Sequence, residues 1–320
     1  MTSPLVSVAI ATYNGAQYLR EQLNTIYAQT WQNLEVVVSD DASTDGTSTI
    51  LLEYAASRGL RHSVNPRRLG LVQNFARAIS LCHGEFIALA DQDDLWKPQK
   101  IEALVDNIGG FTLIYCNSQE VLTSEGFHEI DTTYQRIADF ARAFGTGSPT
   151  RHLLAENWIV SHTLMFRREL LRHALPIPPH QPYHDGWLAL VASKLGGIKY
   201  LDERLQTYRR HPGSLTFVDA AERPHRRTPL AILDGTFGVA WRARCAAEMA
   251  RLKDALELPL LDAEDRAFLN ELLTYYGAGL RGGHGWLAFR AGWKIAPFVA
   301  TLHGSWMRWK FPLRGFIGSS

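Results

Sequence analysis

The chain opens with continuous apolar runs that alternate with segments in which apolar residues recur at helical spacing. The apolar runs predict buried strands at residues 6–12, 34–39 and 85–90. Apolar positions three or four residues apart predict helices over 18–27, after 43–46, and over 71–81. This β-α-β-α-β order predicts an α/β fold with a Rossmann-like, mostly parallel central sheet and helices on both faces.

The second half of the chain has a less regular pattern. Further strands are expected at residues 111–117, 158–166, 198–201 and 205–208, and a helix is expected at 184–195. The polar stretch 123–150 predicts an irregular loop over a site. Residues 226–280 have a helical pattern. We therefore expect one α/β domain over residues 1–225 and a C-terminal helical region over 226–320.

The composition is that of an ordinary globular protein, with 46% hydrophobic and 20% charged residues among 320. The 33 basic and 32 acidic residues give a net charge of +1, which provides no reason to expect nucleic acid as a partner. Three scattered cysteines without a CxxC pair fit a reduced, cytoplasmic setting. The N-terminus lacks the features of a signal peptide, and no run approaches the ~18 apolar residues of a membrane-spanning helix.

The last 40 residues differ in charge from the rest of the chain. They hold six basic residues, no acidic residue and four of the nine tryptophans. Within them Trp286, Phe289 and Trp293 recur at helical spacing, with Arg290 and Lys294 nearby. A helix of this kind can lie in the interface of an anionic bilayer. Alternatively, it packs its aromatic residues on the rest of the protein or in a dimer interface.

One group of carboxylates follows the strand expected at 85–90. Ligands bind at the carboxyl ends of the strands in a parallel sheet, which is where Asp91, Asp93 and Asp94 are placed. An Asp-x-Asp sequence offers two oxygens to a hard divalent cation that also binds diphosphate oxygens. The alternative is a capped turn before the next helix.

The ends of the first and second strands carry further polar residues. Asp40 and Asp41 could accept hydrogen bonds from a nucleotide base or ribose, although such residues are also common in loops. Thr12, Tyr13 and Asn14 end the first strand. There Tyr13 could line a base pocket or merely cover the sheet.

Two later segments contain titratable residues. Asp185, next to His184 at the start of the helix expected at 184–195, could act as a general base if partly desolvated. Either residue could instead simply cap that helix. His211 could bind a metal or a phosphate, or have a structural role.

Motifs of several other enzyme classes are absent from the sequence. The chain has no GxGxxG after its first strand, no GxxxxGK, no GxSxG and no HExxH. Nicotinamide-dependent, P-loop, serine-hydrolase and zinc-protease functions therefore lose their usual support.

Taken in order, these segments resemble the inverting family-two glycosyltransferases of the GT-A fold. The resemblance covers about 210 residues, and its specificity comes from the order and spacing of the motifs. The matching segments are 6–15, 29–31, 38–47, Asn65 with Gly70, 84–98, and 184–211.

The resemblance implies roles for the carboxylates. Asp91 and Asp93 match the family's motif for a divalent cation, Mn²⁺ or Mg²⁺, and for the donor diphosphate, with His211 as an additional metal contact. Asp185 matches the general base that deprotonates the acceptor hydroxyl. Further contacts of the site are expected at Asp94, Trp96, His184, Trp187 and Arg209.

The resemblance also places the donor nucleotide. Asp41, with Asp40 beside it, matches the position that reads the base. Thr12, Tyr13 and Asn14 match the first nucleotide-binding strand.

The stretch 184–211 resembles the rhamnosyltransferase branch, which builds bacterial surface polysaccharides. This implies transfer of L-rhamnose from dTDP-L-rhamnose to a glycan or lipid-linked acceptor in O-antigen synthesis, at the cytoplasmic face of the inner membrane. A UDP-hexose or UDP-N-acetylhexosamine is the alternative donor. Where the family often has Glu-Asp before the acceptor base, this chain has His184 and Asp185, so Asp185 is the candidate carboxylate.

Two other functions fit the pattern less well. A nucleotidyltransferase would have a Gly-rich, basic N-terminal loop for a triphosphate, whereas this chain has Thr12, Tyr13, Asn14 and Gly15 there. A non-catalytic nucleotide-sugar-binding protein is expected to lose a key carboxylate, and none is missing from this sequence.

Overall fold

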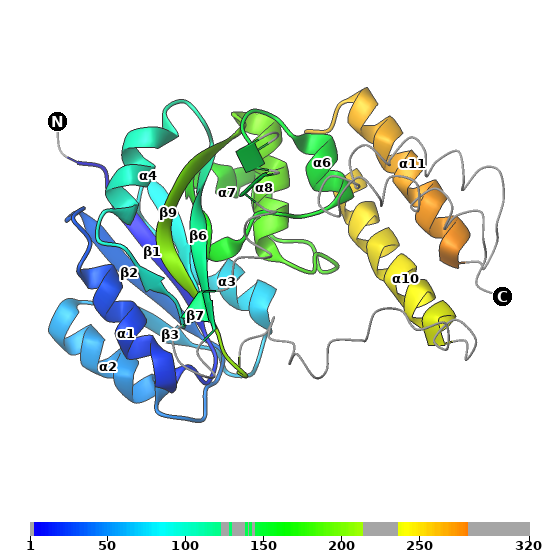
Figure 1. Cartoon of the computed structure of the whole chain (residues 1–320). Coiled ribbons are helices and arrows are strands. Elements are labelled where there is room, and N and C mark those ends of the chain that lie inside the picture. The colour runs from blue at the N-terminus through cyan, green and yellow to red at the C-terminus, as the bar shows by residue number, and fades with distance from the viewer. Residues whose placement is uncertain are drawn as a thin grey trace. The chain divides into compact units, whose positions relative to one another are not determined.

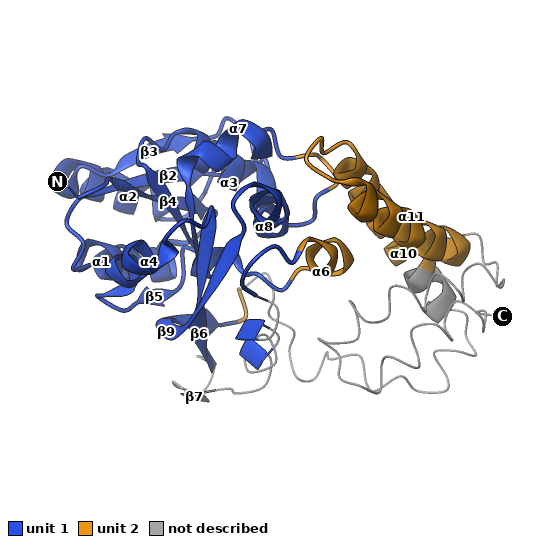
Figure 2. Cartoon of the chain, turned by 90° about the horizontal axis from the view of Figure 1, so that it is seen from above, with its two compact units in different colours: residues 1–149, 158–177, 181–211 blue, residues 150–157, 178–180, 212–320 orange. Residues whose placement is uncertain are grey.

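The computed structural model describes residues 3–122, 128–129, 138–139, 141–142, 145–213 and 236–280. The chain divides into two compact units, coloured separately in Figure 2. Unit 1 comprises residues 1–149, 158–177 and 181–211, and unit 2 comprises 150–157, 178–180 and 212–320. Most of the irregular loop expected at 123–150, and all of the basic aromatic segment 281–320, lie outside the described residues.

Unit 1 is built on a mixed β-sheet. Its strands are β1 (Val6–Thr12), β2 (Leu34–Asp40), β3 (Arg61–Val64), β4 (Phe86–Ala90), β5 (Leu95–Trp96), β6 (Leu113–Leu122), β7 (His128–Glu129), β8 (Leu164–Arg167) and β9 (Ile198–Arg210). They are ordered β3-β2-β1-β4-β8-β6-β9-β5, and β7 pairs with β6. The first four are mutually parallel where they pair, β8 is antiparallel to β4 and β6, and β9 is parallel to β6.

Helices cover both faces of this sheet, as Figure 1 shows. On one face lie α1 (Ala16–Tyr27), α2 (Thr47–Arg58) and α4 (Lys100–Ile108). On the other lie α3 (Leu71–Ser80), α7 (Leu171–Ala174) and α8 (His184–Leu195). Because both faces are covered, every residue of β1 and β4 is buried, which explains why these strands are continuous apolar runs.

The structure confirms the strands expected at 6–12, 34–39 and 85–90, which are β1, β2 and β4, and the helices α1, α2 and α3 expected between them. The strand expected at 158–166 is wrong, because residues Ser161–Thr163 form a short 3-10 helix and only Leu164–Arg167 is a strand. The two strands expected at 198–201 and 205–208 are one long strand, β9, with register shifts against β6. The sequence missed the polar, partly exposed strand β3, since it lacks an apolar pattern.

Glu35 on β2 ties together the amino-terminal ends of four strands. Its carboxylate accepts hydrogen bonds from the Ser7 hydroxyl on β1 and from the His83 backbone N–H, at 2.6 Å, before β4. The Arg61 guanidinium on β3 lies 2.8 Å from its second oxygen. Burial alone would raise the pKa of Glu35, but these hydrogen bonds outweigh it and hold the pKa below its usual value.

Replacing Glu35 with Gln should lower the free energy of unfolding at pH 7 by about 1.5–3 kcal/mol, the usual value for hydrogen bonds to a charged group. Since the folded-state pKa lies below the unfolded one, the carboxylate stabilises the protein above about pH 4.3 and loses this effect as the pH falls through the folded pKa. Urea unfolding of both proteins at pH 7 and pH 3.5 measures the difference. An equal loss at both pH values would contradict the prediction, and Glu53→Gln, in an exposed pair with Arg20, should change little.

Unit 2 contains three described helices, α6 (Thr150–Ala155), α10 (Thr236–Leu256) and α11 (Ala263–Leu280). Arg251 on α10 donates to the Leu154 carbonyl on α6 at 2.8 Å, and Arg151 on α6 pairs with Glu264 on α11. The helical pattern expected at 226–280 is observed over 236–256 and 263–280, and the described residues 257–262 form a turn between these two helices. Among the described residues, no helix is both long and apolar enough to cross a bilayer.

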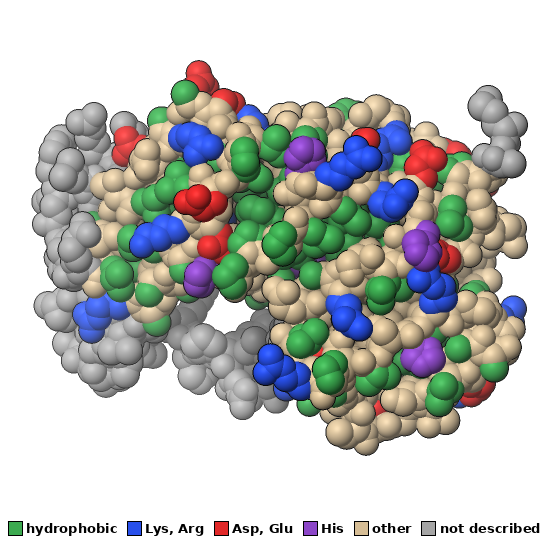
Figure 3. Space-filling view, turned by 180° about the vertical axis from the view of Figure 1, so that it is seen from behind, with side chains coloured by type: hydrophobic (Ala, Val, Ile, Leu, Met, Phe, Trp, Pro, Cys, Tyr) green, Lys and Arg blue, Asp and Glu red, His purple; other side chains and the backbone are tan. Residues whose placement is uncertain are grey.

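Acidic side chains stand among the basic ones on the face of the molecule seen in Figure 3. This mixture agrees with the net charge of +1. Hydrophobic side chains are also interspersed there, so the visible described part of this face has no continuous basic surface.

Candidate active site

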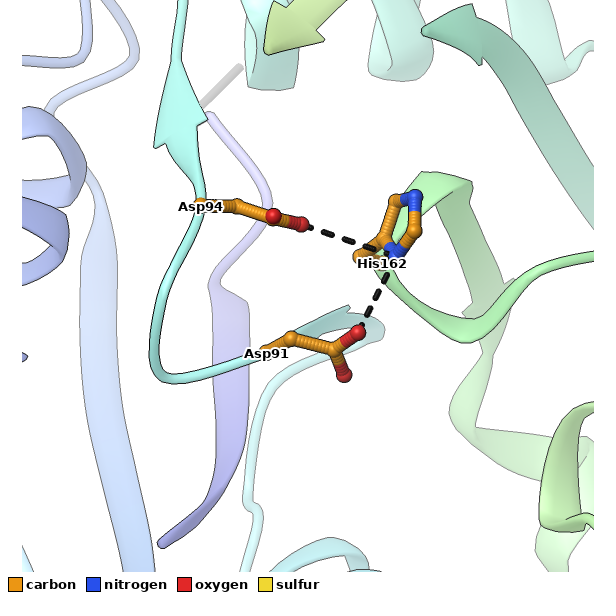
Figure 4. Close-up of side chains that lie close together, drawn as sticks. All are labelled: Asp91, Asp94 and His162. Carbon is orange, nitrogen blue, oxygen red and sulfur yellow. Dashed lines mark hydrogen bonds and ion pairs between the residues drawn. The ribbon is translucent and has the colours of Figure 1, made fainter. Parts of the chain in front are cut away.

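The turn between β4 and β5 brings two carboxylates and a histidine together (Figure 4). Nδ1 of His162 lies 3.0 Å from Oδ2 of Asp91 and 3.5 Å from Oδ2 of Asp94. The ligand atoms of these three residues all lie within 4.8 Å of one another. Because β1 pairs with β4 in parallel through Ile10 and Ala90, the cluster lies at the carboxyl ends of both strands, where the sequence predicted the chemistry.

The charges of this cluster compensate one another. Burial disfavours the imidazolium of His162, but Asp94 and Asp91 outweigh it and raise its pKa. Burial likewise opposes ionisation of Asp91, whose pKa is nevertheless held low by the hydrogen bond and charge of His162. Burial and repulsion from Asp93 and Asp91 raise the pKa of Asp94 to about 7. The contacts therefore favour an ionised Asp91 beside a protonated His162, and Asp94 is the carboxyl group that burial most strongly keeps protonated.

Lys100, the first residue of α4, contacts the backbone of His162 in this cluster. Its ammonium is fully buried, donates to the His162 carbonyl at 2.6 Å and to the Gln206 side chain, and lies 3.7 Å from the centre of the Trp96 ring. Burial lowers the pKa of Lys100 to about 8. Trp96, an expected site contact, is only 4% exposed, and its ring packs against this lysine.

Asp93 faces the end of β9. Nε2 of His211 lies 2.9 Å from Oδ2 of Asp93, and their side chains are 8% and 15% exposed. The buried Arg209 donates to the Asp93 carbonyl and pairs with Glu21 on α1. Its backbone N–H also donates to Oδ1 of Asp94 at 3.2 Å. Arg209 thus fixes the aspartate turn against β9, which brings Asp93 and His211 together as the sequence predicted.

The residues at the ends of β1 and β2 are joined to one another. The Thr12 hydroxyl donates to Oδ1 of Asp40 at 2.7 Å, and Oδ2 of Asp40 accepts from the Ser43 backbone N–H at 3.0 Å. Both Thr12 and Asp40 are buried. Tyr13 is 37% exposed, and the Arg68 guanidinium lies 4.0 Å from the centre of its ring. Of Thr12, Tyr13 and Asp40, Tyr13 alone is exposed.

Asp41, which follows the end of β2, is held in place by three hydrogen bonds to its carboxylate. Its carboxylate accepts hydrogen bonds from Nδ2 of Asn65 at 3.0 Å and from the backbone N–H groups of Leu69 and Gly70 at 2.7 and 2.8 Å. Gly70 has a φ of 85°, which favours glycine at this turn. Asn14 has a φ of 47°, and its side-chain oxygen accepts from the Thr44 backbone N–H. These contacts order the loops around the predicted base-binding position.

Asp185 lies in the first turn of α8 and is 7% exposed. Its Oδ2 accepts from the Ser161 backbone N–H at 2.9 Å, and its Oδ1 accepts from the Gly186 N–H at 2.6 Å. The Ser161 hydroxyl donates to Oδ1 of Asp91 at 3.1 Å. Ser161 therefore connects Asp185 with Asp91 of the aspartate cluster. Trp187 donates through Nε1 to a carbonyl of α7 at 2.9 Å and anchors the helix.

His184 lies between α8 and α3. Its ring stacks on Phe75 with the ring centres 3.9 Å apart, and the residue is 1% exposed. Neither ring nitrogen has a hydrogen-bond partner in the described part of the protein. Burial lowers the pKa of His184 to about 4, although the charge of Asp91 opposes this.

Sequence reasoning missed Ser161, His162 and Lys100. A signal was present for the first two, because Ser161, His162 and Thr163 interrupt the apolar run at 158–166. No such signal marks Lys100, since a lysine at the start of an amphipathic helix is ordinarily exposed.

A surface groove of about 730 Å³ lies elsewhere on unit 1 and is not part of this cluster. Its lining includes Leu5 and Glu85, which precede β1 and β4. The groove is therefore at the amino ends of these strands, opposite the edge that carries the aspartates.

The sequence is similar to those of known glycosyltransferases. The family model described as glycosyl transferase family 2 matches residues 7–173. An uncharacterized glycosyltransferase of Nostoc sp. is 29% identical over 229 residues, covering 68% of this chain and 67% of its own length. An uncharacterized glycosyltransferase of Haemophilus influenzae is 28% identical over 228 residues, which cover 67% of this chain and 68% of the relative's length.

Solved structures have the same fold. TarS from S. aureus, determined with UDP-GlcNAc, matches 98% of this chain and 89% of its own at a TM-score of 0.56 and 17% identity. The mannosyltransferase PcManGT from Pyrobaculum calidifontis, determined with GDP-Man and Mn²⁺, matches 98% and 86% at a TM-score of 0.55 and 19% identity. The mixed sheet with flanking helices is accordingly a GT-A-like glycosyltransferase fold.

Proposed function

The chain belongs to glycosyl transferase family 2, and we propose that it is an inverting enzyme, with its chemistry in residues 1–225, that transfers a sugar from a nucleoside diphosphate to an acceptor hydroxyl. The observation that carries the proposal is the link through Ser161, whose backbone holds Asp185 and whose side chain holds Asp91. It joins a carboxylate suited to the acceptor to the carboxylates suited to the donor diphosphate.

Asp185 is the general base in this proposal. Inversion requires the acceptor oxygen to attack the anomeric carbon in line with the departing diphosphate, while its proton passes to a base. Two backbone N–H groups orient the carboxylate of Asp185. Orientation before the reaction is what makes such a base effective.

The nucleotide lies at the ends of β1 and β2. The exposed ring of Tyr13 offers a face for a base to stack on. The fixed carboxylate of Asp41 offers an acceptor for an N–H group of the base, with Asn14 and Asp40 shaping the loops around it.

Two sets of residues could hold a divalent cation, Mn²⁺ or Mg²⁺. Asp94 and His162 are almost fully buried, and Nδ1 of His162 already faces both Asp91 and Asp94. Asp93 and His211 are more exposed, and they offer a carboxylate oxygen and an imidazole nitrogen that suit Mn²⁺. We therefore assign the cation to Asp93 and His211, with Asp91, whose side chain is 28% exposed, as a further ligand from the same turn. A cation bound there supplies charge neutralisation for the leaving diphosphate.

The donor is proposed to be dTDP-L-rhamnose, with UDP-hexose or UDP-N-acetylhexosamine as the alternative. Support for rhamnose comes from the stretch 184–211, which resembles rhamnosyltransferases of O-antigen and surface polysaccharide synthesis. Support for the alternative comes from the UDP-GlcNAc bound by TarS. The acceptor would be a glycan or a lipid-linked saccharide.

A thermal-shift panel of nucleotide sugars with Mn²⁺ or Mg²⁺ tests this function. A donor at 100 times its Kd should stabilise the native state by about 2.7 kcal/mol. We expect dTDP-L-rhamnose to give the largest shift and transfer to follow with an acceptor panel. A nucleotide sugar that binds without turnover on any acceptor would favour a non-catalytic binding protein, and no shift with any donor would contradict the proposal.

We propose that segment 281–320 brings the enzyme to the cytoplasmic face of the inner membrane. The support is its sequence, with six basic and no acidic residues and four tryptophans. Each basic residue near an anionic surface contributes about 1 kcal/mol, so Arg290→Glu with Lys294→Glu should strongly reduce pelleting with phosphatidylglycerol vesicles. Pelleting that is unchanged by these substitutions and by 0.5 M salt would contradict this role.

A further inference from the structure

His184 is a buried polar residue whose hydrogen-bonding groups are unused. It is 1% exposed, and among the described residues nothing lies within hydrogen-bond distance and geometry of Nδ1 or Nε2. Buried polar groups in native proteins almost always have a partner, and an exception requires an explanation such as a ligand or an ordered water. The histidine is therefore either a ligand-binding group or the site of a bound water.

The position of His184 favours a ligand. It directly precedes Asp185, and Asp91 is the charge that acts on its ring. In the proposed reaction the donor diphosphate lies near Asp91 and the anomeric carbon lies within reach of Asp185. His184 precedes Asp185 in the chain and lies within electrostatic range of Asp91, so a sugar bound between these two carboxylates would lie near it.

The orientation of the ring is fixed by packing. The ring of Phe75, on α3, is stacked on the imidazole with an interplanar angle of 21°. Phe75 is itself buried, so the plane in which the two nitrogens lie is set before a ligand binds. A preoriented group of this kind can discriminate between ligands.

The chemistry of the imidazole matches a hydroxyl group. Burial lowers the pKa of His184 to about 4, so the ring is neutral at pH 7. A neutral imidazole has one N–H donor and one acceptor nitrogen. A sugar hydroxyl both donates and accepts, whereas a phosphate oxygen at neutral pH chiefly accepts.

We propose that His184 binds the sugar of the donor through hydrogen bonds between its ring nitrogens and separate sugar hydroxyls, and thereby contributes to donor specificity. This inference rests on the proposed function, since it requires a nucleotide sugar in the site. It goes beyond that function because it assigns the recognition of the sugar, as distinct from the nucleotide, to a particular residue.

The test compares the affinity of the nucleoside diphosphate with that of the nucleotide sugar. Calorimetry with dTDP and dTDP-L-rhamnose, or with the pair that the donor panel selects, gives the ratio of the two Kd values in the presence of Mn²⁺. His184→Phe keeps a ring to stack on Phe75 but removes both nitrogens. It should reduce the preference for the sugar-bearing ligand by about 5–10-fold, the value of one or two neutral hydrogen bonds, and leave the Kd of dTDP unchanged.

Two further variants separate recognition from folding. His184→Gln retains a donor and an acceptor and should keep most of the preference, while His173→Phe, an exposed histidine on α7, should keep all of it. The Tm of His184→Phe should stay the same or rise, since two unpartnered buried nitrogens are removed.

The possible results distinguish the two proposals. A sugar preference that is unchanged in His184→Phe would show that the nitrogens bind only water, and would overturn the inference. The same holds if the unsubstituted protein binds dTDP and dTDP-L-rhamnose equally well. If it binds no nucleotide at all, the proposed function itself fails.

Discussion

Replacing Asp185 with Asn should lower kcat by about 10²–10⁴-fold, the usual contribution of a general base, with little change in donor affinity. An amide keeps the size of the side chain but does not take up the proton of the acceptor hydroxyl. Since Asp185 is placed on the acceptor side of the reaction, the contacts of the nucleotide are unaffected. Donor Kd by calorimetry and transfer rate at saturating substrates measure the two effects separately.

The hydrogen bonds of Asp185 require a stability control. One of its two oxygens becomes an NH₂ group in the variant, which then faces either the Ser161 or the Gly186 backbone N–H. We expect a loss of about 1–3 kcal/mol in unfolding free energy, so activity must be compared well below the Tm. Asp106→Asn, exposed on α4, is the matched control and should retain full activity. If Asp185→Asn loses donor binding and turnover equally, the assignment of the base is wrong.

The parallel part of the fold could be predicted because buried strands and the helices that cover them have recognisable hydrophobic patterns in the sequence. Strands such as β1, covered on both faces, must be mostly apolar, with the buried hydroxyls of Ser7 and Thr12 hydrogen-bonded, and the helices between them must be amphipathic. The edge strand β3 has no such hydrophobic pattern, since its residues are partly or fully exposed. Strand β5 could not be predicted either, because its two residues are too few to form a pattern.

The sequence predicted the site residues that belong to a motif, but it missed the residues that contact them from other parts of the chain. Asp93 and His211 were recognised from a motif, and the structure brings them within 2.9 Å. His162 was missed because its partners lie about 70 residues away in the chain and only tertiary structure brings them together. Lys100 shows the same limit, because its position in the sequence does not indicate that a lysine would be fully buried beneath a carboxylate cluster.

Replacing Asp93 or His211 with Ala should lower kcat/KM by roughly 10²–10³-fold at limiting Mn²⁺, which corresponds to about 3–4 kcal/mol of lost charge stabilisation. Excess chelator should have a similar effect on the unsubstituted enzyme and little further effect on either variant. Mn²⁺ affinity is measured by titration with electron paramagnetic resonance detection. His180→Ala, which removes an exposed histidine paired with Asp254 in unit 2, should leave both quantities unchanged.

The double variant decides whether these two residues hold the same ion. If both bind one cation, either substitution already loses it, so the double variant should be hardly worse than each single one. Independent roles would instead give additive losses. Retention of full Mn²⁺ affinity by Asp93→Ala would place the ion with Asp91, Asp94 and His162. In either set an ion must displace the hydrogen that links imidazole and carboxylate. Asp94 and His162 are almost fully buried, whereas Asp93 and His211 are more exposed, and this difference in access is the reason for assigning the ion to the latter pair.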